Sequence, residues 1–396
     1  MAEKNLDFDT VIDRTHTNSL KYDFAVQRGK PKDVLPLWVA DMDFQVSSYI
    51  QEALSDSVAH GIFGYSEADG SYFEAVAGWM GRHFGWNVEE PWLVKTPGIV
   101  FALAQAVRAF TEPGDAVLLQ QPVYYPFSQV IRDNGRNIVD NTLVQEEDGR
   151  YRIDFADFEE KIRSCKVKLF FLCNPHNPVG RVWTREELLR LGDICEKYGV
   201  IVVSDEIHAD FVFEGSHQVL AGLKESYRKF VVTCTAPSKT FNLAGLQVSN
   251  IFIPDDALRR KFEQAVAASG YSQLNTMGLV ACEAAYRHGE EWYDAVKAYI
   301  RENLAYAQHF LEEQIPQVKA VKPEGTYLLW VDFRSLGLSR KELEDLIVKK
   351  AGLWLDSGDI FGAAGRGFER INVACPRSVL TEALERLARA VRECVK

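Results

Sequence analysis

The sequence predicts an α/β protein in which a large domain, built on a mostly parallel sheet, is joined to a smaller α+β domain. Its 396 residues suit two domains better than one core. In the middle of the chain, apolar strands alternate with helices as in βαβ units, which form parallel sheets. After residue 290 a long helix and a compact tail of strands and helices follow. We therefore expect an N-terminal arm (1–50) that joins the small domain, a large domain (51–290) and a small C-terminal domain (291–396).

Composition narrows the class of protein. The chain is 47% hydrophobic with a net charge of −11, so a basic nucleic-acid surface is not expected. The first residues lack the basic and apolar regions of a secretory signal, and no apolar run approaches the ~20 residues that span a bilayer. The seven cysteines form no C-x-x-C pair. The sequence predicts a soluble, cytoplasmic protein with no membrane segment.

The first hundred residues lead into the predicted large domain. A short strand is expected within 34–44, closed by acidic residues, and a helix from about Tyr49. Glycines flank aromatic residues in a loop over Gly61–Tyr65. Apolar residues at helical spacing predict a helix over 71–84, and another follows over 99–110.

The middle of the chain is predicted to contain four strands, and the last two of them, over 200–204 and 230–235, are expected to be buried. The four strands are expected over 116–119, 167–173, 200–204 and 230–235. Thr184 and Glu187 have the spacing of a capping box, so a helix should begin there and end at Gly199. The last third predicts helices over 255–269, 277–288 and 291–314, strands over 327–333 and 370–374, a helix over 340–349 and a C-terminal helix from Leu380.

Unusual polar and aromatic residues follow these strands at their carboxyl ends. They are Tyr124 and Tyr125, then Asn177, then Asp205 with His208, and finally Lys239. Because parallel strands bring their carboxyl ends to one edge, where open α/β sheets bind ligands, the four groups should converge. An exposed strand-end lysine is the commoner case, but these neighbours favour a functional Lys239.

Each converging side chain suits one part of a flat, anionic heteroaromatic cofactor that carries an aldehyde. Partial burial of Lys239 favours the neutral amine, which can form a Schiff base. Asp205 can keep a ring nitrogen protonated, so that the ring draws electrons. Asn177 can donate to a ring oxygen, and Tyr124 offers a flat face for stacking.

The anionic end of such a cofactor also has a predicted place. The backbone N–H groups of Gly98, Ile99 and Val100 open a helix, where a phosphate is favoured. The hydroxyl of Ser238 can add a contact, and His208 can add a second contact to the ring oxygen. His208 could equally be a hydrogen-bonded structural histidine.

These motifs resemble those of the fold-type I enzymes that use pyridoxal 5'-phosphate (PLP), the aspartate aminotransferase superfamily. The resemblance lies in Asn-Pro-His-Asn-Pro-Val-Gly at 174–180, the buried strand into Asp205 and Ser238-Lys239, and it extends from Leu35 to the C-terminus. Within the superfamily the chain is most similar to the MalY/PatB group of cystathionine β-lyases, or C-S lyases. That narrower resemblance lies in residues 38–44, 204–211, 239–245 and 370–377.

The resemblance implies a set of roles. Lys239 is then the Schiff-base and catalytic lysine, Tyr125 lies near the substrate, and Arg370 grips the substrate's α-carboxylate. Tyr65 reaches the cofactor of the neighbouring subunit, so a homodimer with shared active sites is implied. The implied reaction is α,β-elimination on L-cystathionine or related cysteine S-conjugates, giving a thiol, pyruvate and ammonia, with a place in methionine biosynthesis.

Three alternatives stay open beside the lyase. An aminotransferase is the enzyme alternative, although Ala236 and Gln247 stand where many transaminases have a phosphate-binding serine and arginine. A PLP-binding regulatory protein is the second. The third is a metal site at Asp205, Glu206, His208 and Asp210, which the absence of a second His/Cys cluster disfavours. The preferred thiol leaving group is not predicted.

Overall fold

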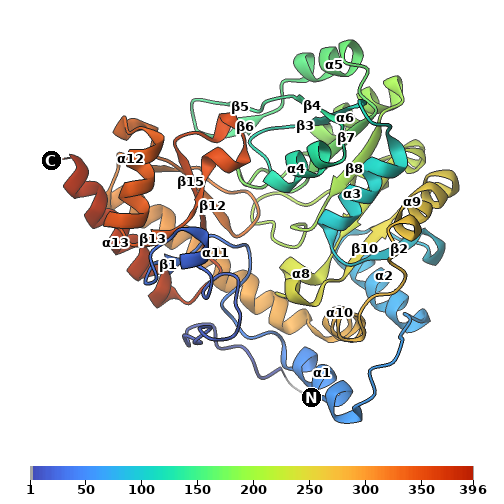
Figure 1. Ribbon diagram of the computed structural model, residues 1–396, viewed down its shortest axis with the longest axis horizontal. Coiled ribbons are helices and arrows are strands. Elements are labelled where there is room, and N and C mark those ends of the chain that lie inside the picture. The colour runs from blue at the N-terminus through green and yellow to red at the C-terminus, as the bar shows by residue number, and fades with distance from the viewer. Residues whose placement is uncertain (1–2, 396) are drawn as a thin grey trace.

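A seven-stranded sheet forms the centre of the larger part of the protein, in a computed structural model that describes residues 3–395 (Figure 1). Its strands are β2 (Leu93–Thr96), β3 (Ala116–Leu119), β4 (Asn137–Asp140), β7 (Leu169–Cys173), β8 (Ile201–Asp205), β9 (Val231–Thr235) and β10 (Ser249–Phe252). The order is β2-β10-β9-β8-β7-β3-β4. β10 pairs antiparallel with β2 and β9, and the remaining pairs are parallel. The predicted mostly parallel α/β fold is confirmed.

Both faces of this sheet are buried, as the apolar strands predicted. Alternate residues of β7 enter two different hydrophobic clusters, Phe170 and Leu172 on one face and Leu169 and Phe171 on the other. One face is covered by α3 (Ile99–Phe110), α4 (Tyr125–Asp133) and α9 (Asp256–Ala268). The other is covered by α2 (Gly70–Phe84), α5 (Phe155–Ser164), α6 (Arg185–Tyr198), α7 (Leu220–Leu223) and α10 (Thr276–His288).

Helix α6 shows that local sequence signals were sufficient for some boundaries. The Thr184 side chain accepts the Glu187 N–H, and the Glu187 carboxylate accepts the Thr184 N–H in return. Gly199 ends the helix with φ 67°, a left-handed conformation that favours glycine. The predicted capping box is confirmed, as are the exact bounds of α3 and β3.

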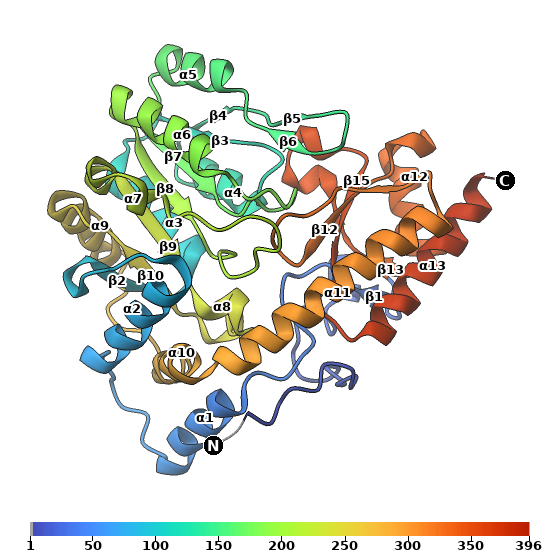
Figure 2. The ribbon, with the colours of Figure 1, turned by 180° about the vertical axis from the view of Figure 1, so that it is seen from behind.

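The smaller part of the protein is built on an antiparallel sheet of order β11-β12-β15-β14. Its strands are β11 (Lys319–Ala320), β12 (Leu328–Asp332), β14 (Asp356–Ser357) and β15 (Phe368–Asn372). The arm joins it through β1 (Leu35–Pro36), which pairs with β13 (Leu353–Trp354). Figure 2 shows α11 (Glu290–Gln314) running from the large sheet into this part, where it packs along α13 (Arg377–Val395). We propose that the domain boundary lies at the start of α11.

Several elements differ from the sequence-based expectation. The helix predicted over 340–349 is a short α12 (Arg340–Glu344) followed by a π-helical turn (Asp345–Lys350). α13 begins before Leu380. Strands β4, β10 and the hairpin β5 (Val144–Gln145) and β6 (Tyr151–Arg152) were not predicted, nor were α4 and α5. α1 (Ser48–His60) packs on α10, and one-turn α8 (Pro237–Thr240) follows β9.

The strand predicted within 34–44 is limited to β1, because the carbonyls that follow bind side chains instead of a neighbouring strand. Arg370 donates to the Trp38 carbonyl (2.9 Å), and Asn372 donates to the carbonyls of Val39 and Asp41 (both 2.6 Å). The Ala40 carbonyl is also taken, by groups described below. We name residues 38–41 the carbonyl segment.

No helix within residues 3–395 is long and apolar enough to cross a membrane.

Asn372 should be critical for holding the carbonyl segment. Asn372→Ala leaves two part-buried carbonyls without their side-chain donors, so we expect the free energy of unfolding to fall by about 2–3 kcal/mol. Urea denaturation measures this loss. Asn137→Ala removes an exposed side chain with one bond to the Gly114 carbonyl and should cost about 0.5 kcal/mol or less. Equal losses in the two variants would contradict the assignment.

Candidate functional site

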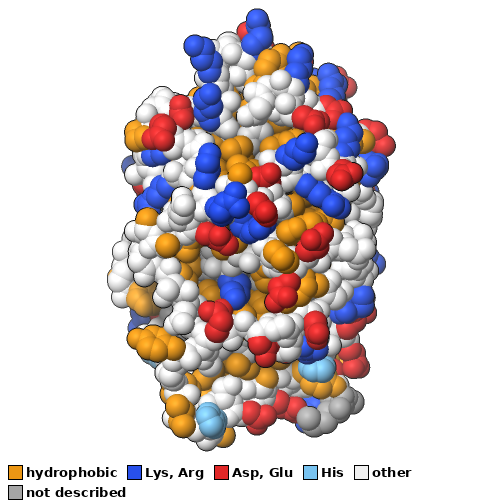
Figure 3. All heavy atoms as spheres, turned by 90° about the vertical axis from the view of Figure 1, so that its right-hand side faces the viewer, with side chains coloured by type: hydrophobic (Ala, Val, Ile, Leu, Met, Phe, Trp, Pro, Cys, Tyr) orange, Lys and Arg blue, Asp and Glu red, His pale blue; other side chains and the backbone are white. Residues whose placement is uncertain are grey.

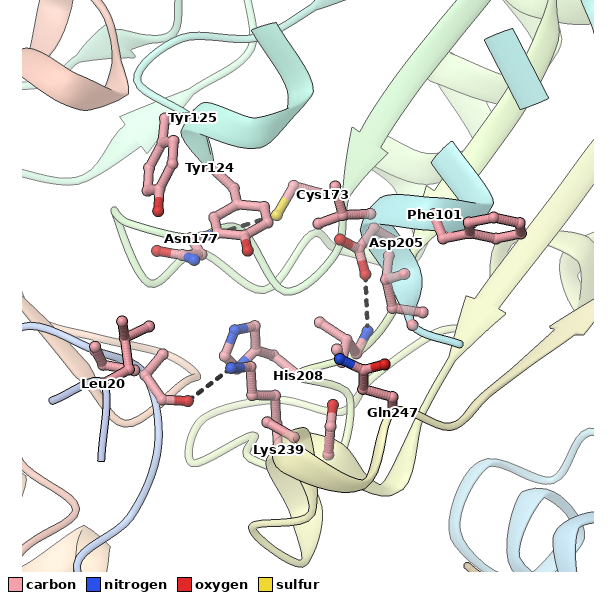
Figure 4. Close-up of a pocket in the computed structure, with 18 of the residues that line it drawn as sticks. Leu20, Phe101, Tyr124, Tyr125, Cys173, Asn177, Asp205, His208, Lys239 and Gln247 are labelled. Carbon is pink, nitrogen blue, oxygen red and sulfur yellow. Dashed lines mark hydrogen bonds between the residues drawn. The ribbon is translucent and has the colours of Figure 1, made fainter. Parts of the chain in front are cut away.

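A cavity of about 380 Å³ lies at the carboxyl edge of the large sheet, between this sheet, the carbonyl segment and the small sheet (Figure 4). The predicted residues that line it are Gly98, Ile99, Val100, Tyr124, Tyr125, Asn177, Asp205, His208, Ser238, Lys239 and Arg370. The strands β2, β3, β7, β8 and β9 are mutually parallel, so the loops that follow them open on this one edge. Of the predicted site residues, Tyr65 alone lies outside this cavity.

Lys239 stands on α8, directly after β9, and points toward the carbonyl segment (Figure 4). Its Nζ donates to the Ala40 carbonyl at 2.6 Å. Burial lowers the pKa of Lys239 to about 8, although the Asp41 carboxylate opposes this shift. Near pH 7 about a tenth of the amine is therefore neutral, far more than for an ordinary lysine of pKa ~10.4.

Asp205 ends β8 and faces Lys239 across the cavity. One carboxylate oxygen accepts the Ile207 N–H at 3.2 Å. Burial raises the pKa of Asp205 to about 7, and the Lys239 ammonium opposes the rise. A cationic ring nitrogen placed against the carboxylate would favour its ionised form, because opposite charges lower a carboxyl pKa.

Asn177 is oriented by Arg370. Arg370 Nη1 donates to Asn177 Oδ1 at 2.9 Å, which leaves the Asn177 Nδ2 group as the donor that faces the cavity. The backbone holds the loop as well, since the Tyr124 N–H donates to the Asn177 carbonyl at 3.0 Å. The sequence predicted Asn177 as a donor to a ring oxygen, and this orientation suits that role.

Arg370 is buried on β15 and already has several acceptors. Its Nη2 donates to the Trp38 carbonyl and forms an ion pair with Asp356. Its Nε has no acceptor among the described residues. The Asp356 carboxylate thus partly neutralises the Arg370 guanidinium, and it is a partner that the sequence did not predict.

The aromatic residues and His208 form the walls of the cavity. The Tyr124 and Tyr125 rings lie 5.5 Å apart at 52°, and Tyr125 is 38% exposed, at the mouth. His208 packs edge-on against Tyr327 at 5.8 Å, and its Nδ1 has no partner within residues 3–395. Burial holds the pKa of His208 well below its usual range, so the ring is neutral and can accept or donate.

The N-terminus of α3 has no side-chain cap. Gly98 adopts φ 128°, which favours glycine, and its N–H donates to Ser249 Oγ at 3.1 Å. Three backbone N–H groups were predicted to hold a phosphate. The N–H of Gly98 already donates to Ser249, whereas those of Ile99 and Val100 stay available to donate to an anion. The neutral Gln247 lines the same end of the cavity, so no arginine supplements these amides there.

The polar groups of the cavity fit PLP. The uncapped start of α3 suits its phosphate, Asp205 its ring nitrogen and Asn177 Nδ2 its ring oxygen. Lys239 suits its aldehyde. Each of these polar groups can form a further hydrogen bond beyond those described above.

The acidic residues around His208 do not form a metal site. Glu206 binds Ser204 and His217 (both 2.8 Å), and Asp210 accepts from Trp79 Nε1 (2.9 Å). These bonds engage both carboxylates. Across residues 3–395, three or more His, Cys, Asp or Glu side chains nowhere gather closely enough to hold a metal ion.

The sequence reasoning missed several lining residues, among them Leu20, Ala40, Cys173, Asp356 and Ile207. Ala40 acts through its carbonyl, which no residue-type pattern reveals, although it lies within the motif at 38–44. Leu20 comes from the arm and Asp356 from β14, so only the tertiary fold brings them to the cavity.

Tyr65 is 97% exposed, on the extended segment 61–69 between α1 and α2. Ile62 and Phe63 beside it are 71% and 61% exposed. Tyr65 lines a second hollow, which shares Gln247 with the main cavity. Figure 3 looks onto the side of the molecule where this segment lies, and hydrophobic side chains gather there between charged ones. Such a surface is typical of a protein interface.

The chain is similar to known proteins over nearly its whole length. Residues 32–387 match the family described as aminotransferase class I and II. The chain is 46% identical to the cystathionine beta-lyase PatB of Bacillus subtilis, covering 98% of this chain and 100% of the relative. It is 32% identical to protein MalY of Escherichia coli, covering 98% and 99%. Cystalysin from Treponema denticola, whose crystal structure contains a pyridoxal 5'-phosphate cofactor, superposes with a TM-score of 0.95 at 38% identity, covering 98% and 99%.

The titration of Lys239 can be measured in cofactor-free protein. We expect the rate at which an acylating reagent modifies Lys239 to rise with pH around a midpoint near 8. Asp41→Asn should move the midpoint to lower pH, because the Asp41 carboxylate favours the ammonium. Mass spectrometry of the modified peptide gives the rates.

Asp133→Asn is the matched control, since it removes an exposed carboxylate on α4 and should leave the midpoint unchanged. A Lys239 midpoint near that of an ordinary lysine, or the same midpoint in both variants, would contradict the proposed electrostatics.

Proposed function

The chain belongs to the aminotransferase class I and II family, and within this family we propose that it is a PLP-dependent carbon–sulfur lyase. Its substrates would be L-cystathionine and related S-conjugates of cysteine, and its products a thiol, pyruvate and ammonia. The observation that carries the proposal is the placement of Lys239, Asp205, Asn177 and Arg370 around one cavity. The 46% identity to a cystathionine beta-lyase over the whole chain supports it.

PLP is the cofactor of this family, and when bound it supplies an aldehyde for amino groups together with a ring that draws electrons from the substrate's Cα. We assign its contacts to the residues already described. Asp205 holds the proton on the ring nitrogen, and Asn177 Nδ2, aided by His208, donates to the ring oxygen. Tyr124 covers one ring face. The phosphate is held by the N–H groups of Ile99 and Val100 and by Ser238, on the glycine turn at Gly98.

Lys239 has the properties of the general acid–base. A pKa of about 8 allows its amine to accept a proton from Cα and, as an ammonium, to return one to the departing sulfur. Arg370 binds the substrate's α-carboxylate and so fixes Cα relative to Lys239. Tyr125, at the mouth of the cavity, is a second group able to protonate the thiolate as it leaves.

Aminotransferase activity is the second candidate, and the family itself favours it. The two reactions share the removal of the Cα proton and differ in where a proton is returned. Gln247 and Ala236 leave the phosphate end of the cavity without a cationic side chain, a pattern unlike that of many transaminases. This difference favours the lyase.

Two finer assignments belong to the proposal. Release of homocysteine from cystathionine would place the enzyme in methionine biosynthesis, because homocysteine is the immediate precursor of methionine. A cytoplasmic location stays a prediction from the sequence.

We further propose that the active unit is a homodimer in which Tyr65 reaches the partner's cofactor. Tyr65 is 97% exposed, and the neighbouring Ile62 and Phe63 are exposed as well, so the surface of one described chain leaves these apolar side chains uncovered. Gln247, which lines both hollows, marks where the segment of a second chain would meet the main cavity.

Incubation with L-cystathionine, without any keto acid, separates the lyase from the aminotransferase. The lyase predicts sustained pyruvate and thiol release over many turnovers, measured with lactate dehydrogenase and a thiol reagent. Lys239→Ala should lower kcat by at least about a thousandfold, because it removes both the amine that holds the cofactor and the proton carrier. The exposed Lys197→Ala should retain full activity. Turnover only in the presence of a keto acid would contradict the lyase.

A shared site can be tested by mixing two defective chains. Tyr65→Ala should weaken cofactor affinity about tenfold without changing the stability of the folded chain. Co-expression of Tyr65→Ala with Lys239→Ala should restore native cofactor affinity at one site per hybrid dimer, because that site receives Lys239 and Tyr65 from different chains. Cofactor titration of the isolated hybrid, carrying two different tags, measures this. A hybrid with only weakened sites would rule out the shared arrangement.

A further inference from the structure

A separate cavity of about 220 Å³ lies in the small domain, on the far side of Asp356 from the active site. Its charged and polar walls are Lys30, Arg340, Glu344, Asp356, Ser357 and Glu369. Its apolar walls are Ile347, Val348, Trp354, Leu355 and Ile360. Asp356 contributes to the walls of both cavities, so the second cavity directly adjoins the Arg370 site.

Of the three carboxylates that line this cavity, those of Glu344 and Asp356 have ion-pair partners. Lys30 Nζ pairs with Glu344 at 2.8 Å, and Arg340 Nε pairs with Asp359 at 3.2 Å. Asp356 is paired with Arg370. One carboxylate is left over, and it is that of Glu369.

Glu369 is only 3% exposed. No other residue of the described chain forms a hydrogen bond or an ion pair with its side chain. Burial raises the pKa of Glu369 well above its usual range, and the nearby Asp356 carboxylate adds to the shift. An unpaired buried carboxylate is unfavourable, and a cation placed against it removes the penalty.

We propose that this cavity binds a small organic ammonium ion, whose N–H groups donate to the Glu369 carboxylate and whose hydrocarbon part packs against the apolar wall. One unpaired carboxylate matches one positive charge. The apolar side chains opposite it match a hydrocarbon chain and offer nothing to a hydrated inorganic ion. A metal ion also needs several acidic or imidazole ligands, and within residues 3–395 no such group of three exists.

The site is connected to the substrate site through two adjacent strands. Glu369 and Arg370 are consecutive on β15, and they pair with Ser357 and Asp356 of β14. The ion bound at Glu369 would reduce the negative charge that Asp356 experiences and so strengthen its pairing with Arg370. In the proposed function Arg370 binds the substrate's carboxylate. An ammonium ion in the second cavity would therefore weaken substrate binding, and so raise KM more than it lowers kcat.

The test uses the holoenzyme with dimethylbutylammonium, a tertiary amine that cannot condense with an aldehyde. We expect it to raise Tm in a dose-dependent manner, whereas butyrate, its anionic counterpart, leaves Tm unchanged. Glu369→Gln keeps the shape of the side chain and removes its charge, so it should weaken binding of the amine at least about tenfold. Glu312→Gln, an exposed position on α11, is the matched control and should bind as the native protein does.

A second variant keeps the proposal testable if Glu369→Gln fails to fold. Ile360 is 40% exposed at the cavity wall, so Ile360→Trp should obstruct the cavity while Glu369 remains, and binding should again be lost. Equal binding by native protein and Glu369→Gln, or no Tm shift at millimolar amine, overturns the site. A Tm shift with an unchanged KM for cystathionine overturns its connection to Arg370. If the untreated native protein showed no lyase activity, the proposed function would be contradicted. The Tm measurement of amine binding could still be interpreted, because it does not depend on activity.

Discussion

The carbonyl segment is the constraint on which the active-site geometry depends. Its four consecutive carbonyls, Trp38 to Asp41, accept from side chains of both domains. Lys239 and Tyr327 share the Ala40 carbonyl, while Arg370 and Asn372 hold its neighbours. Because a buried carbonyl left without a donor is costly, these bonds fix the arm against the large and the small domain together. Lys239 and Arg370 are thereby held at a set separation by the backbone of the carbonyl segment.

The electrostatics of the site arise because two cations, Lys239 and Arg370, lie beside the carboxylates of Asp41, Asp205 and Asp356. Burial alone would push Lys239 far toward the neutral amine, and Asp41 and Asp205 limit that shift. The arm determines the effect of Asp41, because Arg14 and Lys21 are ion-paired with it at 2.8 and 3.5 Å. Lys21 is itself almost fully buried and pairs with Asp43 at 2.7 Å. The N-terminal arm thus contributes to the pKa of Lys239 through the ion pairs that it forms with Asp41.

The family alone does not decide between elimination and transamination, since both begin by removing the same proton. Under the proposed contacts, the two ends of the cavity bear on this choice. The end assigned to the phosphate offers backbone amides at the start of α3, with the neutral Gln247 beside them. At the end assigned to the substrate, Asp356 neutralises part of the Arg370 charge. These two features bear on how firmly cofactor and substrate carboxylate are held, which is where related enzymes can differ.

The sequence by itself determined the α/β class, the capping box of α6, the bounds of α3 and the order of the polar residues that follow the strands. These features are local, or follow from parallel pairing, so periodicity and turn chemistry suffice. The tertiary structure alone decided that residues 38–41 form no strand, that the Gly98 amide is taken by Ser249, and that Asp356 and Leu20 reach the cavity. It also showed the unpaired Glu369, whose environment comes from strands, helices and an arm far apart in the chain. Side-chain pairing between distant segments leaves no local pattern, and for that reason the sequence could not reveal it.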